Sequence, residues 1–278
     1  MTWEDAVVWL RNQPEKRQLV LDAFYDDPLI DAAERYFAST EWQAVAKVLQ
    51  NRTGRVLDVG AGRGIASYAL ARSGFAVTAL EPDPSPVVGT AAVRGLAAEA
   101  RLPIEVVEEF SERLPFDDGA FDVVFARAVM HHMRDLDSAS REMFRVLRPG
   151  GMLVAVREHV ISKETDLGKF LDQHPLHHLY GGEHAFVLDR YIGALRGAGF
   201  AAIEVLAPLN SPINLFPYTI ETLRSAVVQS LTSKIPMKPV WRAALASKSV
   251  FMSLLSIAER FDHRPGRLYS FVCHKAPS

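Results

Sequence analysis

The sequence predicts an α/β fold built around a mostly parallel β-sheet. From Arg55 onward, short apolar segments alternate with segments of helical periodicity. A glycine-rich turn joins the first apolar segment to the first of these helices, and "PGG" at residues 149–151 separates a later helix from the next strand. Such alternation favours right-handed crossovers between parallel strands. Ligands of these sheets bind at the carboxyl ends of the strands.

Residues 1–53 are expected to form a helical cap before the sheet. Pro14 and Pro28 suit the first turn of a helix, because proline lacks the N–H group that this turn leaves unpaired. Thr40 is expected to cap a helix over residues 41–50, because its hydroxyl can accept a hydrogen bond from the first turn.

Seven short apolar runs are identified as the strands of the sheet. They cover residues 55–59, 76–81, 104–109, 121–127, 152–158, 201–207 and 267–275. Helical periodicity is found between them over residues 64–74, 86–100, 137–148 and 188–198. The core of a single domain over residues 1–278 would then comprise residues 54–208 and 266–278.

Residues 209–265 are interpreted as a helical insertion between the last two strands. The insertion follows a polar, proline-bearing stretch, "PLNSPINLFPYT", and continues as amphipathic helical sequence. Between residues 211 and 264 it carries seven Lys or Arg residues and three Asp or Glu residues. A mildly basic segment of this kind is expected to act as a lid over the active site.

Composition and charge exclude several functional classes. The formal net charge is -2, which does not indicate a nucleic-acid partner. Cys273 is the only cysteine in the sequence, so a disulfide within the chain is excluded and a reducing compartment is expected. The sequence has no apolar run of membrane-spanning length and no signal-peptide pattern at its start. A cytoplasmic protein without stable membrane insertion is therefore expected.

The stretch "RVLDVGAGRGIASYAL" predicts a site for a nucleotide-like ligand. Gly60, Gly62 and Gly64 permit a tight turn and a close approach of the ligand to the backbone. Free N–H groups at the start of the next helix favour a negative or polar ligand group. The spacing is G-x-G-x-G, whereas the dinucleotide fingerprint is G-x-G-x-x-G. Asp58 would repel a pyrophosphate and instead suits a ligand end that carries an ammonium group or hydroxyls.

Glu81 ends the second predicted strand and can accept hydrogen bonds from both hydroxyls of a ribose. Dinucleotide enzymes share this feature, so an NAD(P)-dependent oxidoreductase on a related fold stays open as an alternative. The position of Asp58 and the glycine spacing argue against it.

Four motifs in order resemble those of the class I S-adenosylmethionine-dependent methyltransferases: "VLDVGAGRG", "LEPD", "LPFDDGAFDVVFARAVMHHM" and "FRVLRPGG". The resemblance is nearest to the branch that methylates quinones, sterols and natural products. It covers residues 54–158 strongly and extends weakly to residues 191–200 and the final strand. It implies a Rossmann-like, seven-stranded sheet with an antiparallel last strand, and S-adenosylmethionine as the cofactor.

The resemblance also implies which residues bind this cofactor. Residues at and after the end of the first strand would line the methionine and ribose of the cofactor. Residues after the second strand would contact its ribose and adenine. Residues at the end of the fourth strand would lie near its methionine. Together these residues are Asp58, Gly60, Ala61, Gly62, Glu81, Pro82, Ala126 and Arg127, with Asp83 beside the adenine. The family usually has an acid and a small residue after the third strand. Phe110 and Ser111 stand there in this sequence, so Phe110 is expected to pack on the adenine and the Ser111 N–H to donate to it. Glu109 or Glu112 is the alternative partner for the adenine amino group.

Histidines are the residues proposed for the acceptor side. Methyl transfer depends on alignment, and a base is needed only where the acceptor must lose a proton. His131, which follows the fourth strand, is one expected base, and its alternative role is to orient the loop. In "DQHPLHHLYGGEHAF", His178, Tyr180 or His184 is expected to contact or deprotonate the acceptor. The histidines of this stretch, together with Asp172 and Glu183, also suggest a metal site as an alternative. Their spacing matches no zinc pattern, so a substrate-facing loop is preferred and no metal site is expected.

The sequence therefore predicts an enzyme that methylates an oxygen, nitrogen or carbon of a small organic acceptor. The apolar run "SVFMSLLSIAERF" in the insertion favours an apolar acceptor. A non-catalytic subunit that binds the cofactor is the second alternative. The acceptor and the oligomeric state are not determined by the sequence.

Overall fold

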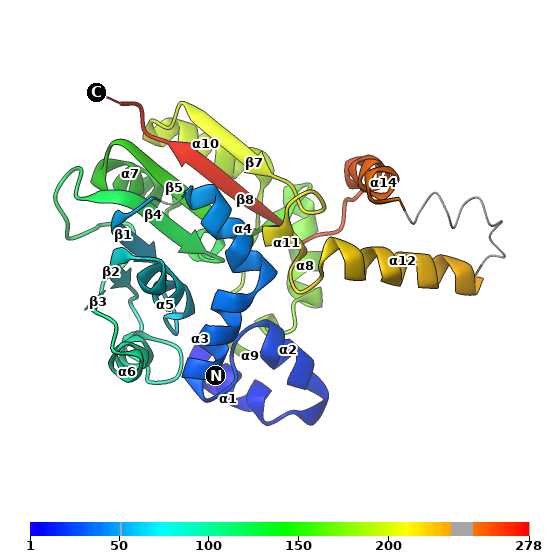
Figure 1. Ribbon diagram of the computed structural model, residues 1–278, viewed down its shortest axis with the longest axis horizontal. Coiled ribbons are helices and arrows are strands. Elements are labelled where there is room, and N and C mark those ends of the chain that lie inside the picture. Colours follow the sequence, from blue (N-terminus) through cyan, green and yellow to red (C-terminus); the bar gives the residue numbers. More distant parts are fainter. Residues whose placement is uncertain (51, 235–246, 278) are drawn as a thin grey trace.

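The computed structural model describes residues 1–50, 52–234 and 247–277, and its centre is a twisted β-sheet (Figure 1). The strand order is β3-β2-β1-β4-β5-β8-β7, with β6 paired to β5 beside this path. The strands are β1 (Gly54–Val59), β2 (Phe75–Leu80), β3 (Ile104–Val107), β4 (Phe121–Arg127), β5 (Leu147–Ile161), β6 (Phe186–Val187), β7 (Ala202–Leu206) and β8 (Arg267–His274). β8 runs antiparallel to both of its neighbours, and the other pairings are parallel. The predicted Rossmann-like sheet with an antiparallel last strand is confirmed.

Helices cover both faces of the sheet and form three layers with it. One core cluster joins the sheet to α7 and α10, and a second joins it to α3, α4 and α5. The helices before and between the strands are α1 (Trp3–Arg11), α2 (Arg17–Asp22), α3 (Leu29–Ala38), α4 (Thr40–Leu49), α5 (Ile65–Arg72), α6 (Thr90–Ala100), α7 (Leu136–Val146), α8 (Leu167–Gln173), α9 (His177–Tyr180) and α10 (Leu188–Ala198). The helices that follow β7 are α11 (Pro212–Leu215), α12 (Ile220–Lys234) and α14 (Lys248–Arg260). Short 3-10 turns are η1 (Pro14–Lys16), η2 (Met130–His132) and η3 (Glu164–Asp166).

The predicted N-terminal helices are present, with one correction. Pro14 opens η1 and Pro28 precedes α3, as the proline positions predict. Ser39, and not Thr40, caps α4: its hydroxyl accepts a hydrogen bond of 3.1 Å from the N–H of Trp42. Ser39 and Thr40 are both good capping residues, so the local sequence alone did not decide between them.

Two further differences concern the strands. β5 begins at Leu147 and so includes the "PGG" turn that was expected to precede it. β6 has only two residues, and a pairing this short leaves no alternating pattern in the sequence.

The expected insertion contains the predicted helices, within the residues that the structure describes. α11 packs against α4, β5 and β8, whereas α12 and α14 pack on each other and project from the side of the sheet (Figure 1). Residues 235–246 of the predicted insertion lie outside the described residues. In the described part of the chain, no helix has the length and apolar character needed to cross a membrane.

Candidate active site

A cavity of about 650 Å³ lies where β1, β2 and β4 end. Its volume lies in the usual range of small-molecule sites. The N-terminal cap closes one side of it with Trp3, Leu19 and residues 22–25. Ten of the predicted site residues line it: Asp58, Gly60, Ala61, Gly62, Glu81, Pro82, Asp83, Arg127, His131 and Tyr180.

The turn after β1 is bound to the turn after β2 through Glu81. The Glu81 carboxylate accepts hydrogen bonds from the N–H of Gly62 at 2.8 Å and from the N–H of Asp83 at 3.0 Å. Burial raises the pKa of this carboxyl. Gly60 has φ +65°, and a Cβ there would lie 2.2 Å from a methyl carbon of Val129. The close packing of this turn therefore requires glycine.

Asp58 is 1 % exposed at the end of β1. Ser67, in the first turns of α5, donates a hydrogen bond of 2.6 Å to its carboxylate. Burial raises the pKa of Asp58 to about 7, although the Ser67 hydrogen bond acts in the opposite direction. A cation placed beside Asp58 would favour its ionised form.

Arg63 binds the N-terminal cap to the glycine turn. Its guanidinium is buried and donates hydrogen bonds to the carbonyls of Phe24 at 2.9 Å and Asp26 at 3.0 Å, and it pairs with the Asp27 carboxylate. Phe24 and its neighbours line the cavity, so Arg63 holds that wall in place.

Arg63→Ala is expected to lower the free energy of unfolding by about 1–3 kcal/mol, because two buried carbonyls lose their donor. Thermal unfolding measures the loss, and limited proteolysis within residues 1–27 should become faster. Arg196→Ala, at an exposed position of α10, is the matched control. Equal melting temperatures for the two variants would contradict this role of Arg63.

A buried ion-pair cluster lies beneath the cavity. The Glu41 carboxylate, on α4, is fully buried. It accepts hydrogen bonds from Nε and Nη2 of Arg127, at 2.6 and 3.0 Å. Arg157 lies 3.5 Å from the same carboxylate and donates to the carbonyls of Ile213 and Phe216. Burial alone would lower the pKa of Arg127, but Glu41 raises it above its usual value. Both arginines line the cavity.

His131 is held by a second buried carboxylate, Glu158 of β5. Glu158 accepts hydrogen bonds from the N–H groups of Val129 and His131, each at 3.1 Å, and from Nδ1 of His131 at 2.7 Å. Nδ1 therefore carries the proton, and Nε2 is left as an acceptor that faces the cavity. Burial holds the pKa of His131 well below its usual value, so the ring is neutral.

The other side of the cavity is formed by the loop after α9. Glu183 is buried there and accepts a hydrogen bond from the Tyr180 hydroxyl. His174 also lines this wall, with Nε2 3.6 Å from the Glu183 carboxylate. This segment therefore lies where an acceptor could contact it, and its predicted role toward the acceptor stays a prediction.

Five predicted site residues do not line the cavity. One of them is His184, whose ring lies against that of Phe186, with 4.4 Å between the centroids. Phe110 is 49 % exposed, with the Arg134 guanidinium over its ring, and Ser111 follows it. Ala126 is fully buried in β4. His178 is exposed, and its Nε2 forms a hydrogen bond with the carbonyl of Asp172. α12 and α14 contribute no described residue to the lining, and Pro217 comes from the segment before them. The adenine role of Phe110 and the lid role of residues 209–265 remain predictions.

Sequence reasoning gave no site role to Glu41, Glu158 or His159, and it named Glu183 only as part of the metal alternative. Glu41 and Glu158 could have been flagged as acids within segments of apolar periodicity, which marks a buried, paired charge. His159 carries no such signal, because its partners come from other parts of the chain.

Residues 57–155 match a protein family described as a methyltransferase domain. An uncharacterized methyltransferase of Mycobacterium sp. (strain JLS) is 35% identical over 158 residues, which are 56% of this chain and 52% of that protein. A ubiquinone biosynthesis O-methyltransferase of Methylobacterium nodulans is 29% identical over 162 residues, which are 57% of this chain and 64% of that protein. The match thus spans about half to two thirds of the length of these relatives.

Solved structures with this fold include a phosphoethanolamine N-methyltransferase 2 of Haemonchus contortus, in complex with phosphomonomethylethanolamine and S-adenosylhomocysteine. The TM-score is 0.54 at 19% identity, and the alignment covers 85% of this chain and 52% of that chain. At this identity, the likeness shows the fold alone.

Proposed function

We propose that this chain, whose residues 57–155 belong to the class I S-adenosylmethionine-dependent methyltransferases, transfers a methyl group to a small organic acceptor. S-adenosylmethionine is the cofactor typical of this family. One observation carries the proposal: Asp58, the glycine turn and Glu81 converge on the same cavity as His131. A cofactor and an acceptor can therefore meet in one cavity.

The two ends of the cavity suit the two substrates. Asp58 is the acid for the ammonium of the cofactor, and Glu81 offers its remaining lone pairs to the ribose hydroxyls. Glycines at positions 60 and 62 let the cofactor approach the backbone without meeting a Cβ. The opposite wall, with His131 and Tyr180, is left for the acceptor.

His131 is the residue best placed to accept a proton from the acceptor. Its Nε2 faces the cavity, and Glu158 fixes the tautomer and the orientation of the ring. The cofactor supplies the reactive methyl group, and the protein supplies alignment.

The proposed function is tested by calorimetric titration with S-adenosylhomocysteine, followed by transfer of a labelled methyl group to a panel of phenols, quinones and amines. NADH is the parallel control. Micromolar binding of S-adenosylhomocysteine with transfer to one class of acceptor would support the proposal. Binding of NADH alone would overturn it, and cofactor binding without transfer across the panel would favour the non-catalytic subunit.

Binding of S-adenosylhomocysteine is expected to release protons near pH 6. The pKa of Asp58 is about 7 without ligand, so the carboxyl is mostly protonated at pH 6. An adjacent ammonium lowers this pKa, so binding expels the proton. Affinity should then rise with pH up to about 7 and level off above it.

Calorimetry in buffers of different ionisation enthalpy measures this proton release directly. Asp58→Asn should abolish both the proton release and the pH dependence below 7. Proton uptake on binding, or an affinity that does not vary between pH 5 and 7, would contradict the assignment.

A further inference from the structure

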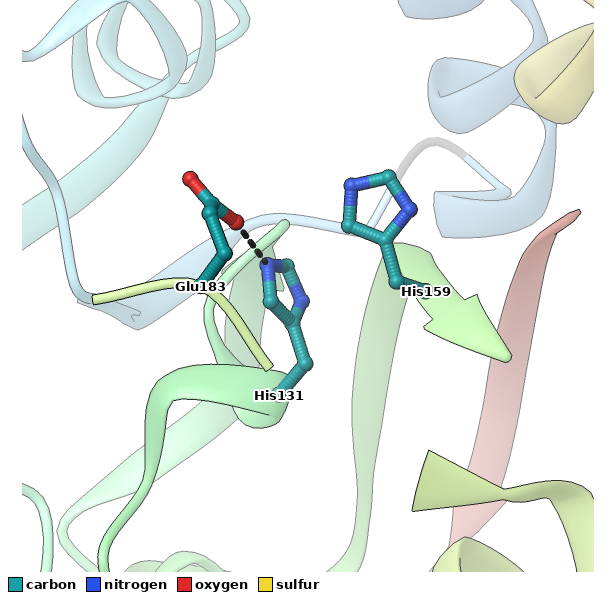
Figure 2. A group of neighbouring side chains, drawn as sticks. All are labelled: His131, His159 and Glu183. Carbon is teal, nitrogen blue, oxygen red and sulfur yellow. Dashed lines mark ion pairs between the residues drawn. The ribbon is translucent and has the colours of Figure 1, made fainter. Parts of the chain in front are cut away.

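Three side chains from separate parts of the chain meet at the acceptor wall of the cavity. They are His131 of η2, His159 of β5 and Glu183 of the loop after α9 (Figure 2). One potential ligand atom from each lies within 4.8 Å of the other two. His131 and Glu183 are buried, His159 is half-buried, and all three line the cavity.

Both imidazoles have a free lone pair directed into this cluster. Nδ1 of His131 donates to Glu158 at 2.7 Å, and Nδ1 of His159 donates to the carbonyl of Gly266 at 3.1 Å. Each Nε2 is therefore unprotonated, and Figure 2 shows both of them turned toward Glu183. Histidines that bind a metal have this arrangement, in which the second ring nitrogen donates to a carboxylate or a carbonyl.

The separation of His131 from Glu183 is too long for a hydrogen bond and suits a bound ion. Nε2 of His131 lies 4.0 Å from the Glu183 carboxylate, and the Nε2 atoms of His132 and His174 lie 3.9 and 3.6 Å from the same oxygen. A direct hydrogen bond would be about 2.9 Å long. Two ligands that each lie about 2.1 Å from one ion are separated by roughly 3–4 Å.

The charge of Glu183 also fits a cation site. Glu183 is buried, and a cation beside its carboxylate would offset the cost of burying that charge.

We propose that His131, His159 and Glu183 bind one divalent transition-metal ion. Two nitrogens and one carboxylate oxygen suit zinc or iron(II) better than magnesium, which prefers oxygen ligands. Chain spacing alone predicted no metal site, because the ligands are spread from residue 131 to residue 183.

The position of the ion would define the acceptor class. Because the cluster lines the cavity, the ion would keep one side open to it, as catalytic metal sites do. An acceptor with an oxygen donor, such as a phenol or an enol, would bind there in place of water. His131 would then act as a ligand and not as the base. This consequence rests on the proposed methyl transfer, whereas metal binding itself does not.

The test uses the full chain, stripped of metal with a chelator and dialysed. Zinc is titrated by calorimetry and cobalt(II) by visible absorption, with circular dichroism to check the fold of every variant. We expect one ion per chain with micromolar or tighter affinity, and at least tenfold weaker binding in each of His159→Gln and Glu183→Gln. His274→Gln is the control. His274 is exposed and lies at the end of β8, whereas His159 pairs with Leu268 near the start of that strand.

Absence of zinc and cobalt binding, or equal affinity in both site variants and the wild type, would overturn the proposal. If one variant fails to fold, the other still decides. S-adenosylhomocysteine is titrated into the same metal-free sample. If S-adenosylhomocysteine binds but zinc and cobalt do not, the metal site is refuted and the proposed function is not. If the metal binds but no methyl group is transferred, the proposed function is refuted and the metal site is not.

Discussion

Glu81→Ala is expected to weaken the binding of S-adenosylhomocysteine at least tenfold, which corresponds to about 1.4 kcal/mol. The carboxylate has two functions that the variant removes together. It is the proposed acceptor for the ribose hydroxyls, and it holds the N–H groups of Gly62 and Asp83. A hydrogen bond to a charged group contributes about 1.5–3 kcal/mol, so tenfold is a lower bound.

Glu81→Gln separates these two functions, and calorimetric titration compares the two variants. Its carbonyl oxygen can still accept one hydrogen bond, while its amide cannot accept the second. The loss of affinity should therefore be smaller than in Glu81→Ala. Glu99→Ala, at an exposed position on α6, should bind like the wild type. A folded Glu81→Ala variant with unchanged affinity would remove Glu81 from the cofactor site.

Much of the fold was predictable because its signals are local. Strands of the parallel sheet are short apolar runs, and glycine and proline mark where they end. β6 and the early start of β5 were missed because a two-residue pairing and a strand with a turn at its start have no periodic signal.

The convergence of Asp58, the glycines and Glu81 on one cavity was predictable for the same reason. Asp58, the glycines and Glu81 lie in short contiguous motifs at strand ends, and strand order then brings the motifs together. The buried carboxylates that hold Arg127 and His131 in place were not predictable, because these contacts join distant residues. Arg127 and Glu41 are 86 residues apart, and His131 and Glu158 are 27 apart. The residues next to Glu41 and Glu158 in the sequence do not indicate which side chain each of them contacts.

Glu41 shows how strongly such a distant contact can matter. Its carboxylate is fully buried, while the side chains of Arg127 and Arg157 are only 16% and 14% exposed. Removing one partner of a buried ion pair leaves uncompensated charge in a poorly solvated place, at a cost of about 3–5 kcal/mol. Here two guanidinium groups would lose the same carboxylate.

Glu41→Ala is therefore expected to lower the free energy of unfolding by about 3–5 kcal/mol, measured by urea denaturation at 25 °C. Because Arg127 and Arg157 line the cavity, the variant should also bind S-adenosylhomocysteine more weakly wherever it stays folded. Glu41→Gln keeps a hydrogen-bond acceptor without the charge, so its loss should be intermediate. Glu34→Ala, at an exposed position on α3, should change stability by less than about 0.5 kcal/mol. If Glu41→Ala and Glu34→Ala unfolded at the same urea concentration, the buried cluster would not be a major source of stability, and the geometry beneath the cavity would have to be held by the packing of α4 alone.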